Sequence, residues 1–308
     1  MLIGSQLHTN STDWGQVQDV ARIMDDGPWA SVWVPDHFVP PLAFLDEDGD
    51  CLEGWSLLTG IAAVTRSLRM GVLVTGNTYR NPALLAKMAA TVDQISGGRL
   101  ELGIGAAWHV REHEAYGFDF PSVRERSDRL EEATELIRKL FTADGPVDHD
   151  GRYYRLVNAP FAPRGAQDPH IPIMVGGNGE RRTLRTLARY GDIMNLDEAT
   201  PAQVVHKIGV LEEHCREIGR DPAEITKTCF FPVALQDDEA KAEHLRGLWD
   251  SGKTPEERTR LAIGPADHII DVIREYEATG VEQVIFKGMP NNPRLYERVQ
   301  AEILPAFA

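Results

Sequence analysis

The chain has 308 residues, of which 42% are hydrophobic and 26% charged, and its formal net charge at pH 7 is −15. This composition is ordinary for a folded globular protein, and the length suits a (β/α)8 barrel, which needs roughly 250 residues. The acidic charge argues against a nucleic acid or an anionic membrane, because phosphate groups are bound by a surplus of Lys and Arg. We therefore expect neither as a partner.

Short apolar, β-branched runs alternate with longer amphipathic runs along the whole chain. The predicted strands are 2–7, 31–35, 68–75, 100–105, 171–176, 192–196, 225–234 and 283–287. The predicted helices are 13–25, 54–65, 82–95, 127–141, 180–190, 202–218, 238–249 and 266–278. Such strands pair in parallel through right-handed crossovers, and eight of them favour a closed barrel over an open sheet. The pattern predicts one α/β domain over residues 1–308, a (β/α)8 TIM barrel.

Two polar segments interrupt this alternation. Residues 39–53 follow the second predicted strand, and residues 142–169, rich in Gly, Pro and Asp, form an insertion between strands four and five. Loops of this length are usually functional or lid-like. We expect both segments to form walls or lids over a substrate.

Cysteine usage and the N-terminus bear on the compartment. Cys51, Cys215 and Cys229 have neither metal-ligand nor redox spacing, so we expect reduced, structural thiols in a cytoplasmic protein. The first residues lack the basic and apolar regions of a signal peptide, and no run reaches 18 consecutive apolar residues. We expect neither a signal peptide nor a transmembrane helix.

In a barrel the active site lies where the strands end, so polar residues there are the first candidates. Asp36 and His37 follow the second strand; a carboxylate beside an imidazole can orient a cofactor and move a proton. The alternative is a turn cap beside a surface histidine. Thr75 and Asn77 end the third strand and suit the polar edge of a ring system, although turns favour the same residues.

The fourth strand ends in a glycine–alanine run through Ala106, which lets the backbone approach a flat ligand. His109 and His113 follow at a spacing of four residues, which is compatible with a metal. The segment lacks the signature of zinc proteases and an evident third ligand, so we expect no metal.

Glycines follow the fifth strand and precede a helix. Such a turn binds anions, because free N–H groups and the helix dipole point at the ligand. The alternative is a plain glycine-rich turn. The residues that would hold a phosphate are Gly176, Gly177, Asn178 and Gly179.

The following residues resemble the luciferase-like monooxygenase superfamily, and within it the oxidoreductases that depend on the deazaflavin coenzyme F420: 33–38, 74–93, 95–105, 108–117, 126–141, 151–154 and 172–179. The resemblance implies a cofactor lying across the strand ends, with Asp36 touching it and His37 donating or accepting a proton. It implies a strand bulge with a cis peptide at Leu73 to Thr75, behind the ring, and a homodimer. The further cofactor contacts it implies are Leu73, Val74, Thr75, Asn77, Ala106, His109 and Gly176 to Gly179.

The leading hypothesis is hydride transfer between coenzyme F420 and a small organic substrate, with the protein supplying orientation and electrostatics. One alternative keeps the fold but uses FMN in a monooxygenase. A second is a barrel that binds a cofactor without catalysis. The sequence leaves the substrate and the direction of transfer open.

Overall fold

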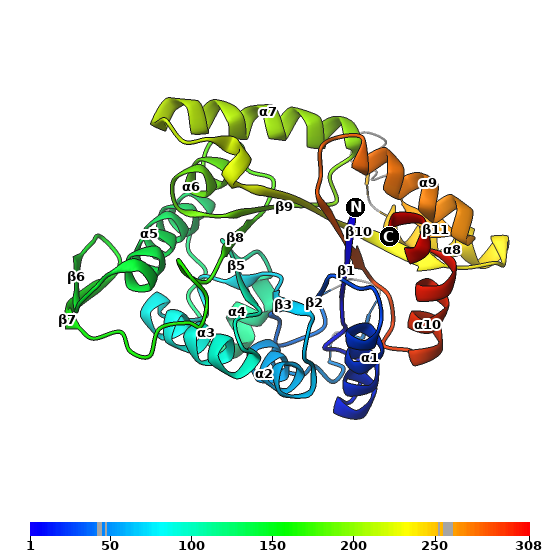
Figure 1. Cartoon of the computed structure of the whole chain (residues 1–308), viewed down its shortest axis with the longest axis horizontal. Helices are drawn as coiled ribbons and strands as arrows, with labels where there is room; N and C mark the ends of the chain where they lie inside the picture. The colour runs from blue at the N-terminus through cyan, green and yellow to red at the C-terminus, as the bar shows by residue number, and fades with distance from the viewer. Residues whose placement is uncertain (42–44, 47, 252, 255–260) are drawn as a thin grey trace.

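The computed structural model describes residues 1–41, 45–46, 48–251, 253–254 and 261–308. Within them, eight parallel strands form a closed ring (Figure 1). β1 pairs with β2 and with β12, and β9 pairs with β10, so no edge of the ring is open. The prediction of a (β/α)8 barrel is confirmed. In ring order the strands are β1 (Leu2–Gln6), β2 (Ser31–Val34), β3 (Arg69–Val72), β5 (Leu100–Gly105), β8 (Ile173–Gly176), β9 (Ile193–Asp197), β10 (Thr226–Leu235) and β12 (Gln283–Lys287).

Helices surround this ring, and local sequence fixes many of their ends. Asp13 and Gln16 form a capping box at the start of α1, and Asn81 caps α3 ahead of Pro82. Gly97 ends α3 in the left-handed conformation at φ 70°, which glycine adopts without a steric penalty. The helices are α1 (Trp14–Asp26), α2 (Gly54–Val64), α3 (Pro82–Ser96), α4 (Val110–Tyr116), α5 (Val123–Thr142), α6 (Thr183–Tyr190), α7 (Pro201–Ile218), α8 (Glu239–Trp249), α9 (Ala266–Glu277) and α10 (Pro293–Glu302).

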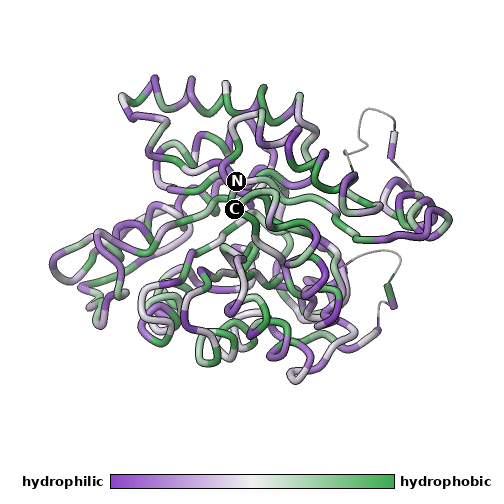
Figure 2. Tube along the Cα trace, turned by 45° about the vertical axis from the view of Figure 1, so that its right-hand side comes forward, coloured by the Kyte–Doolittle hydropathy of each residue, from purple (hydrophilic) through white to green (hydrophobic). Residues whose placement is uncertain are grey.

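The main core lies between the strands and the helices, where the tube in Figure 2 is mostly hydrophobic, while the outer helices alternate in hydropathy. A smaller buried cluster belongs to the strands and their ends: Trp33, Leu73, Met174, Ile193, Phe230 and Ile285. Leu73 and Phe230 of this cluster also border the large cavity described below, so the cluster forms its apolar base. No described helix is both long and apolar enough to cross a membrane.

The predicted elements need correction in three respects: the third strand, the elements that the sequence did not predict, and the insertion. The third strand does not run unbroken from 68 to 75: β3 ends at Val72, a cis peptide joins Leu73 to Val74, and a short strand β4 (Thr75–Gly76) follows. The helices α4 and α10 and the short strand β11 (Ala262–Gly264) were not predicted; α10 packs against α1.

The insertion at 142–169 is also more ordered than predicted. It contains an antiparallel hairpin, β6 (Val147–Asp150) and β7 (Arg155–Ala159), which projects from the side of the barrel in Figure 1. The carboxylate of Glu132 on α5 accepts hydrogen bonds from the backbone N–H groups of Arg152, Tyr153 and Tyr154, which fixes the hairpin to the helix.

Candidate active site

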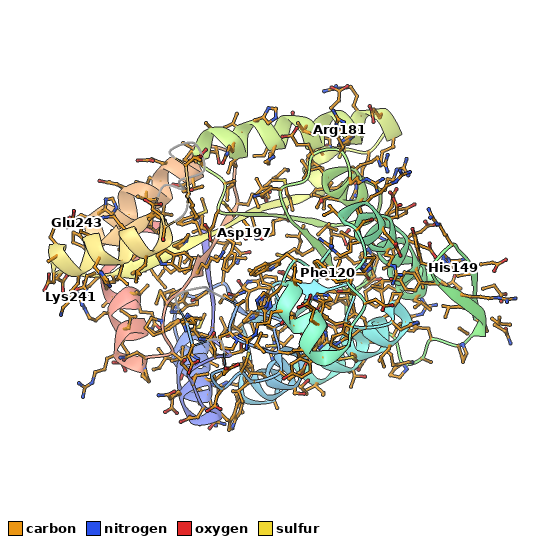
Figure 3. All side chains as sticks on the ribbon, turned by 180° about the vertical axis from the view of Figure 1, so that it is seen from behind. Phe120, His149, Arg181, Asp197, Lys241 and Glu243 are labelled. Carbon is orange, nitrogen blue, oxygen red and sulfur yellow. The ribbon has the colours of Figure 1, made fainter. Side chains whose placement is uncertain are left out.

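A cavity of about 420 Å³ opens at the carboxyl ends of the barrel strands. Asp197 at the end of β9 borders it and lies toward the middle of the molecule in Figure 3, whereas His149 and Lys241 lie at the periphery. Among the predicted site residues, the structure brings the following together on its wall: Asp36, His37, Leu73, Val74, Ala106, Gly176 and Gly177.

Asp36 is buried at the start of the loop after β2 and is paired with an arginine. Its oxygens bind Arg80 Nη1 and Nη2, the latter at 3.0 Å, and Arg80 also binds Glu53. Burial raises the pKa of the Asp36 carboxyl, and the Arg80 guanidinium acts against that rise. Both oxygens of Asp36 are therefore engaged within the protein, and the pair holds the loop after β2 against the loop after β4.

His37 forms a dyad with Glu112, a fully buried residue of α4. His37 Nδ1 lies 2.9 Å from Glu112 Oε1, and the N–H of Phe38 donates to Oε2 at 2.9 Å. The hydroxyl of Tyr79 also donates to Oε1. Burial alone would raise the pKa of Glu112, but the hydrogen bonds from His37, Tyr79 and Phe38 lower it. The carboxylate is therefore charged at neutral pH and holds the proton of His37 on Nδ1, which leaves Nε2 as the basic nitrogen.

The glycines that end β5 and β8 border the cavity beside Val74. A Cβ on Gly176 would lie 2.8 Å from Val74 Cγ1, and one on Gly105 would lie 2.7 Å from Val74 Cγ2. Glycine at these two positions therefore makes room for the side chain of Val74, which borders the cavity with them. Gly177 has a φ of 124°, which side chains rarely adopt.

The start of α6 faces the same part of the cavity. Its N-cap residue, Arg182, makes no side-chain cap, and Thr183 in the first turn borders the cavity. Uncapped N–H groups at a helix start attract anions. Asn178 and Gly179 do not border the cavity; Asn178 exchanges two hydrogen bonds with the backbone of Asp197, at 2.7 and 3.1 Å.

Thr75 and Asn77 lie behind the cavity wall. Thr75 is buried and accepts a hydrogen bond from Trp55 Nε1 at 2.8 Å. Asn77 donates to the hydroxyl of Tyr154 at 3.1 Å, and its own N–H donates to the carbonyl of Gly105. The structure therefore gives these two residues contacts that support the wall, and neither borders the cavity.

His109 lies beside the dyad and does not border the cavity. Its Nδ1 is buried, lacks a hydrogen-bond partner and lies 3.7 Å from Glu112 Oε1. The ligand atoms of His37, His109 and Glu112 all lie within 4.8 Å of one another, a spacing that a cation could bridge. A cation would have to displace donors that already bind Glu112, so the geometry favours acid–base chemistry. His113 points elsewhere, toward Thr78 Oγ1 at 2.7 Å.

Three residues of this network were missed from the sequence: Glu112, Tyr79 and Arg80. Each of these residues lies in, or shortly after, a segment that resembles the family. None of them directly follows a strand. A charged residue within a few positions of a glycine-rich strand end is the signal that would have pointed to Glu112 and Arg80.

Comparison with known proteins decides the family. A family model described as luciferase-like monooxygenase matches residues 2–260. The chain belongs to the luciferase-like monooxygenase family. This confirms the superfamily that the sequence resembles, and the cis peptide between Leu73 and Val74 lies where the resemblance placed it.

Curated relatives and solved structures show which members of the family this chain is similar to. An F420-dependent glucose-6-phosphate dehydrogenase of Amycolatopsis mediterranei is 36% identical over 303 residues, covering 89% of each chain. A second enzyme of that name, from Kineococcus radiotolerans, is 29% identical and covers 88% of this chain and 77% of its own. An F420-dependent secondary alcohol dehydrogenase, solved with an F420–acetone adduct, superposes with a TM-score of 0.85 at 22% identity, covering 100% of this chain and 99% of its own. That likeness supports the barrel fold.

Proposed function

We propose that this protein is an F420-dependent oxidoreductase that transfers a hydride between the cofactor and a small organic substrate. The names of its curated relatives support the cofactor and the reaction class. The observation that carries the proposal is the His37–Glu112 dyad at the edge of a cavity that Val74, Gly105 and Gly176 also border.

The residues present fit such a cofactor. A flat ring system would lie against the wall that Val74 forms with the backbone of Gly105 and Gly176. A phosphate needs N–H donors, and the start of α6 at Thr183 has no side-chain cap. When bound, a deazaflavin supplies a ring carbon that accepts or delivers a hydride.

His37 is the proposed catalytic acid or base. With its proton held on Nδ1 by Glu112, its Nε2 can take a proton from a substrate hydroxyl, or, once the ring carries both protons, return one to a carbonyl oxygen. Trp108 packs edge-on against His37 with the ring centroids 5.5 Å apart, which shields one side of the imidazole from water.

Two experiments test this function. Titration of the purified protein with coenzyme F420 and with FMN, followed by tryptophan fluorescence, should show tight binding of F420 and much weaker binding of FMN. Preferential binding of FMN with oxygen consumption would overturn the proposal in favour of a flavin monooxygenase. A His37→Ala variant should bind F420 normally but lose roughly 100-fold or more in turnover, the usual contribution of general acid–base catalysis.

We also propose that the enzyme is cytoplasmic, as its cysteine usage indicates, and that it is a homodimer of single-domain subunits, as the family resemblance implies for the pairing. Light scattering of the purified protein should give twice the mass of one chain, 34.3 kDa. A monomer at micromolar concentration would contradict this.

A further inference from the structure

Three potential metal ligands, from the loop after β2 and from the start of α4, gather beside the cavity. They are His37, His109 and Glu112. The sequence spaces His109 four residues before His113, but the structure places it next to His37, with the two ring centroids 5.7 Å apart. Both ring nitrogens of His113 are engaged elsewhere, with Thr78 Oγ1 and the carbonyl of His109. The cluster is therefore a product of the fold.

His109 contributes a nitrogen that has no partner among the described residues. Its Nδ1 is buried and lies 3.7 Å from Glu112 Oε1, beyond hydrogen-bond distance. In a neutral imidazole one nitrogen carries a proton and the other carries a lone pair. A lone pair on Nδ1 would be repelled by the carboxylate, and an N–H at this distance is not satisfied by it. A cation between His109 and Glu112 would supply the missing partner.

The distances within the cluster suit a tetrahedral ion. Glu112 Oε1 lies 2.9 Å from His37 Nδ1 and 3.7 Å from His109 Nδ1, and the ligand atoms of all three residues lie within 4.8 Å of one another. Ligands held at about 2.1 Å from a tetrahedral zinc ion are about 3.3 Å apart. A shift of roughly 1 Å in each imidazole would bring the three ligand atoms to this spacing.

The hydrogen bond that such an ion displaces is the one from His37 to Glu112. A carboxylate oxygen has two lone pairs, so Oε1 can bind an ion and keep the hydrogen bond from Tyr79. Oε2 keeps the hydrogen bond from the N–H of Phe38. Tyr79 and Phe38 would then orient the carboxylate, as outer-shell partners do in metal sites. The ion takes the place of the proton on His37 Nδ1.

The ligand types select the metal. Two imidazoles and one carboxylate are a ligand set of Zn²⁺, with a fourth position left for water, whereas Mg²⁺ and Ca²⁺ prefer oxygen ligands. His37 and its neighbour Trp108 border the cavity, so an ion can enter from that side. The formal net charge of −15 attracts cations to the protein from solution.

We propose that His37, His109 and Glu112 bind one Zn²⁺ ion per chain, and that the bound ion prevents His37 from accepting a proton. A neutral imidazole bound to zinc through Nδ1 carries its proton on Nε2, the nitrogen that the metal-free dyad leaves unprotonated. The exchange balances, because one proton leaves Nδ1 and one is taken up at Nε2, without any redox step. The binding of the ion is independent of the proposed function, whereas its effect on catalysis rests on it.

Zinc binding is measured on the full-length protein by calorimetry and by competition with a chromophoric chelator. One ion per chain should bind, and an excess of Mg²⁺ should not displace it. Removal of one ligand in His109→Phe should weaken binding by roughly 100-fold or more, because loss of an outer-shell partner alone costs about 10- to 100-fold. The matched control is His206→Gln, which removes an exposed histidine that also pairs with a glutamate, Glu180 at 3.1 Å, and it should leave this affinity unchanged.

Nitrogen NMR of the histidine rings supplies a readout that needs no variant and that zinc bound elsewhere on the surface would not change. Zn²⁺ should move the proton of neutral His37 from Nδ1 to Nε2, and EDTA should return it to Nδ1. Co²⁺ in place of Zn²⁺ should give the visible absorption of a tetrahedral site.

The outcomes separate this site from the proposed function. Absence of a bound ion, equal Zn²⁺ affinity in a folded His109→Phe protein, or a His37 proton that stays on Nδ1 in the presence of Zn²⁺ would overturn the metal site and leave the proposed function standing. Zinc binding with the tautomer change, in a protein that does not bind F420, would uphold the metal site and overturn the proposed function.

Discussion

Replacing Glu112 by Gln removes one buried negative charge and keeps the size of the side chain. In the native protein the two oxygens accept hydrogen bonds from His37, Tyr79 and the N–H of Phe38. An amide has one oxygen and one NH2 group. If the oxygen accepts the hydrogen bonds of His37 and Tyr79, the NH2 group faces the N–H of Phe38, and both of these groups are donors. At least one buried donor is then left without an acceptor.

Two magnitudes follow from this geometry. A buried donor without a partner costs about 1–3 kcal/mol, so the free energy of unfolding in urea should fall by about 2 kcal/mol. A hydrogen bond to a charged group contributes about 1.5–3 kcal/mol, and its loss from the His37 dyad corresponds to roughly 10- to 150-fold in rate. We expect that loss in kcat, with KM for the substrate changed little, because Glu112 does not border the cavity.

The tautomer of His37 reports directly whether Glu112 positions the imidazole and its proton. Nitrogen NMR of the protein labelled in its histidine rings should show the proton of neutral His37 on Nδ1 in the native enzyme and a mixture of tautomers in Glu112→Gln. Glu114→Gln, exposed on the same helix, serves as the control. A folded Glu112→Gln protein with unchanged kcat and an unchanged tautomer would refute the role of the dyad.

Three further perturbations follow from the structure. Arg80→Met leaves the buried Asp36 carboxylate without its counter-ion, so the free energy of unfolding in urea should drop by about 3–5 kcal/mol, and part of it should return in the double variant with Asp36→Asn. Gly177→Ala places a side chain at φ 124°, a strain of about 1–3 kcal/mol in the folded protein, so the free energy of unfolding in urea should fall by about that amount, and an unchanged value would contradict the strain. The pKa of Glu112 lies below its ordinary value of 4.5 in the folded protein, so its contribution to stability is complete above that pH and is lost as the pH falls through the folded value. Urea unfolding should therefore show a smaller loss of stability between pH 5 and 3 in Glu112→Gln than in the native protein, and equal losses would contradict the shifted pKa.

The barrel could be predicted from the sequence because its signals are local. Strand and helix periodicity, a capping residue such as Asn81 and a stop such as Gly97 depend only on neighbours along the chain. Asp36, His37 and the glycines of the cavity could be found for the same reason, since they directly follow strands.

The parts of the site that the sequence did not predict depend on contacts between segments that lie far apart in the chain. Thr75 follows the third strand in the sequence, but β3 ends at Val72 and the hydroxyl of Thr75 accepts a hydrogen bond from Trp55, so Thr75 does not border the cavity. Glu112 reaches His37 only because α4 folds over the loop after β2, and no spacing within the sequence encodes that approach.

The β6–β7 hairpin has a consequence for any attempt to reduce this barrel to a minimal scaffold. Glu132 ties the turn of the hairpin to α5, and the hydroxyl of Tyr154, in the same turn, accepts a hydrogen bond from the amide of Asn77, whose own N–H binds Gly105 at the cavity. The projecting segment is thus a brace for the cavity wall and cannot be treated as a removable appendage. A shortened chain that lacks it would retain all eight barrel strands and still lose a support of its binding surface.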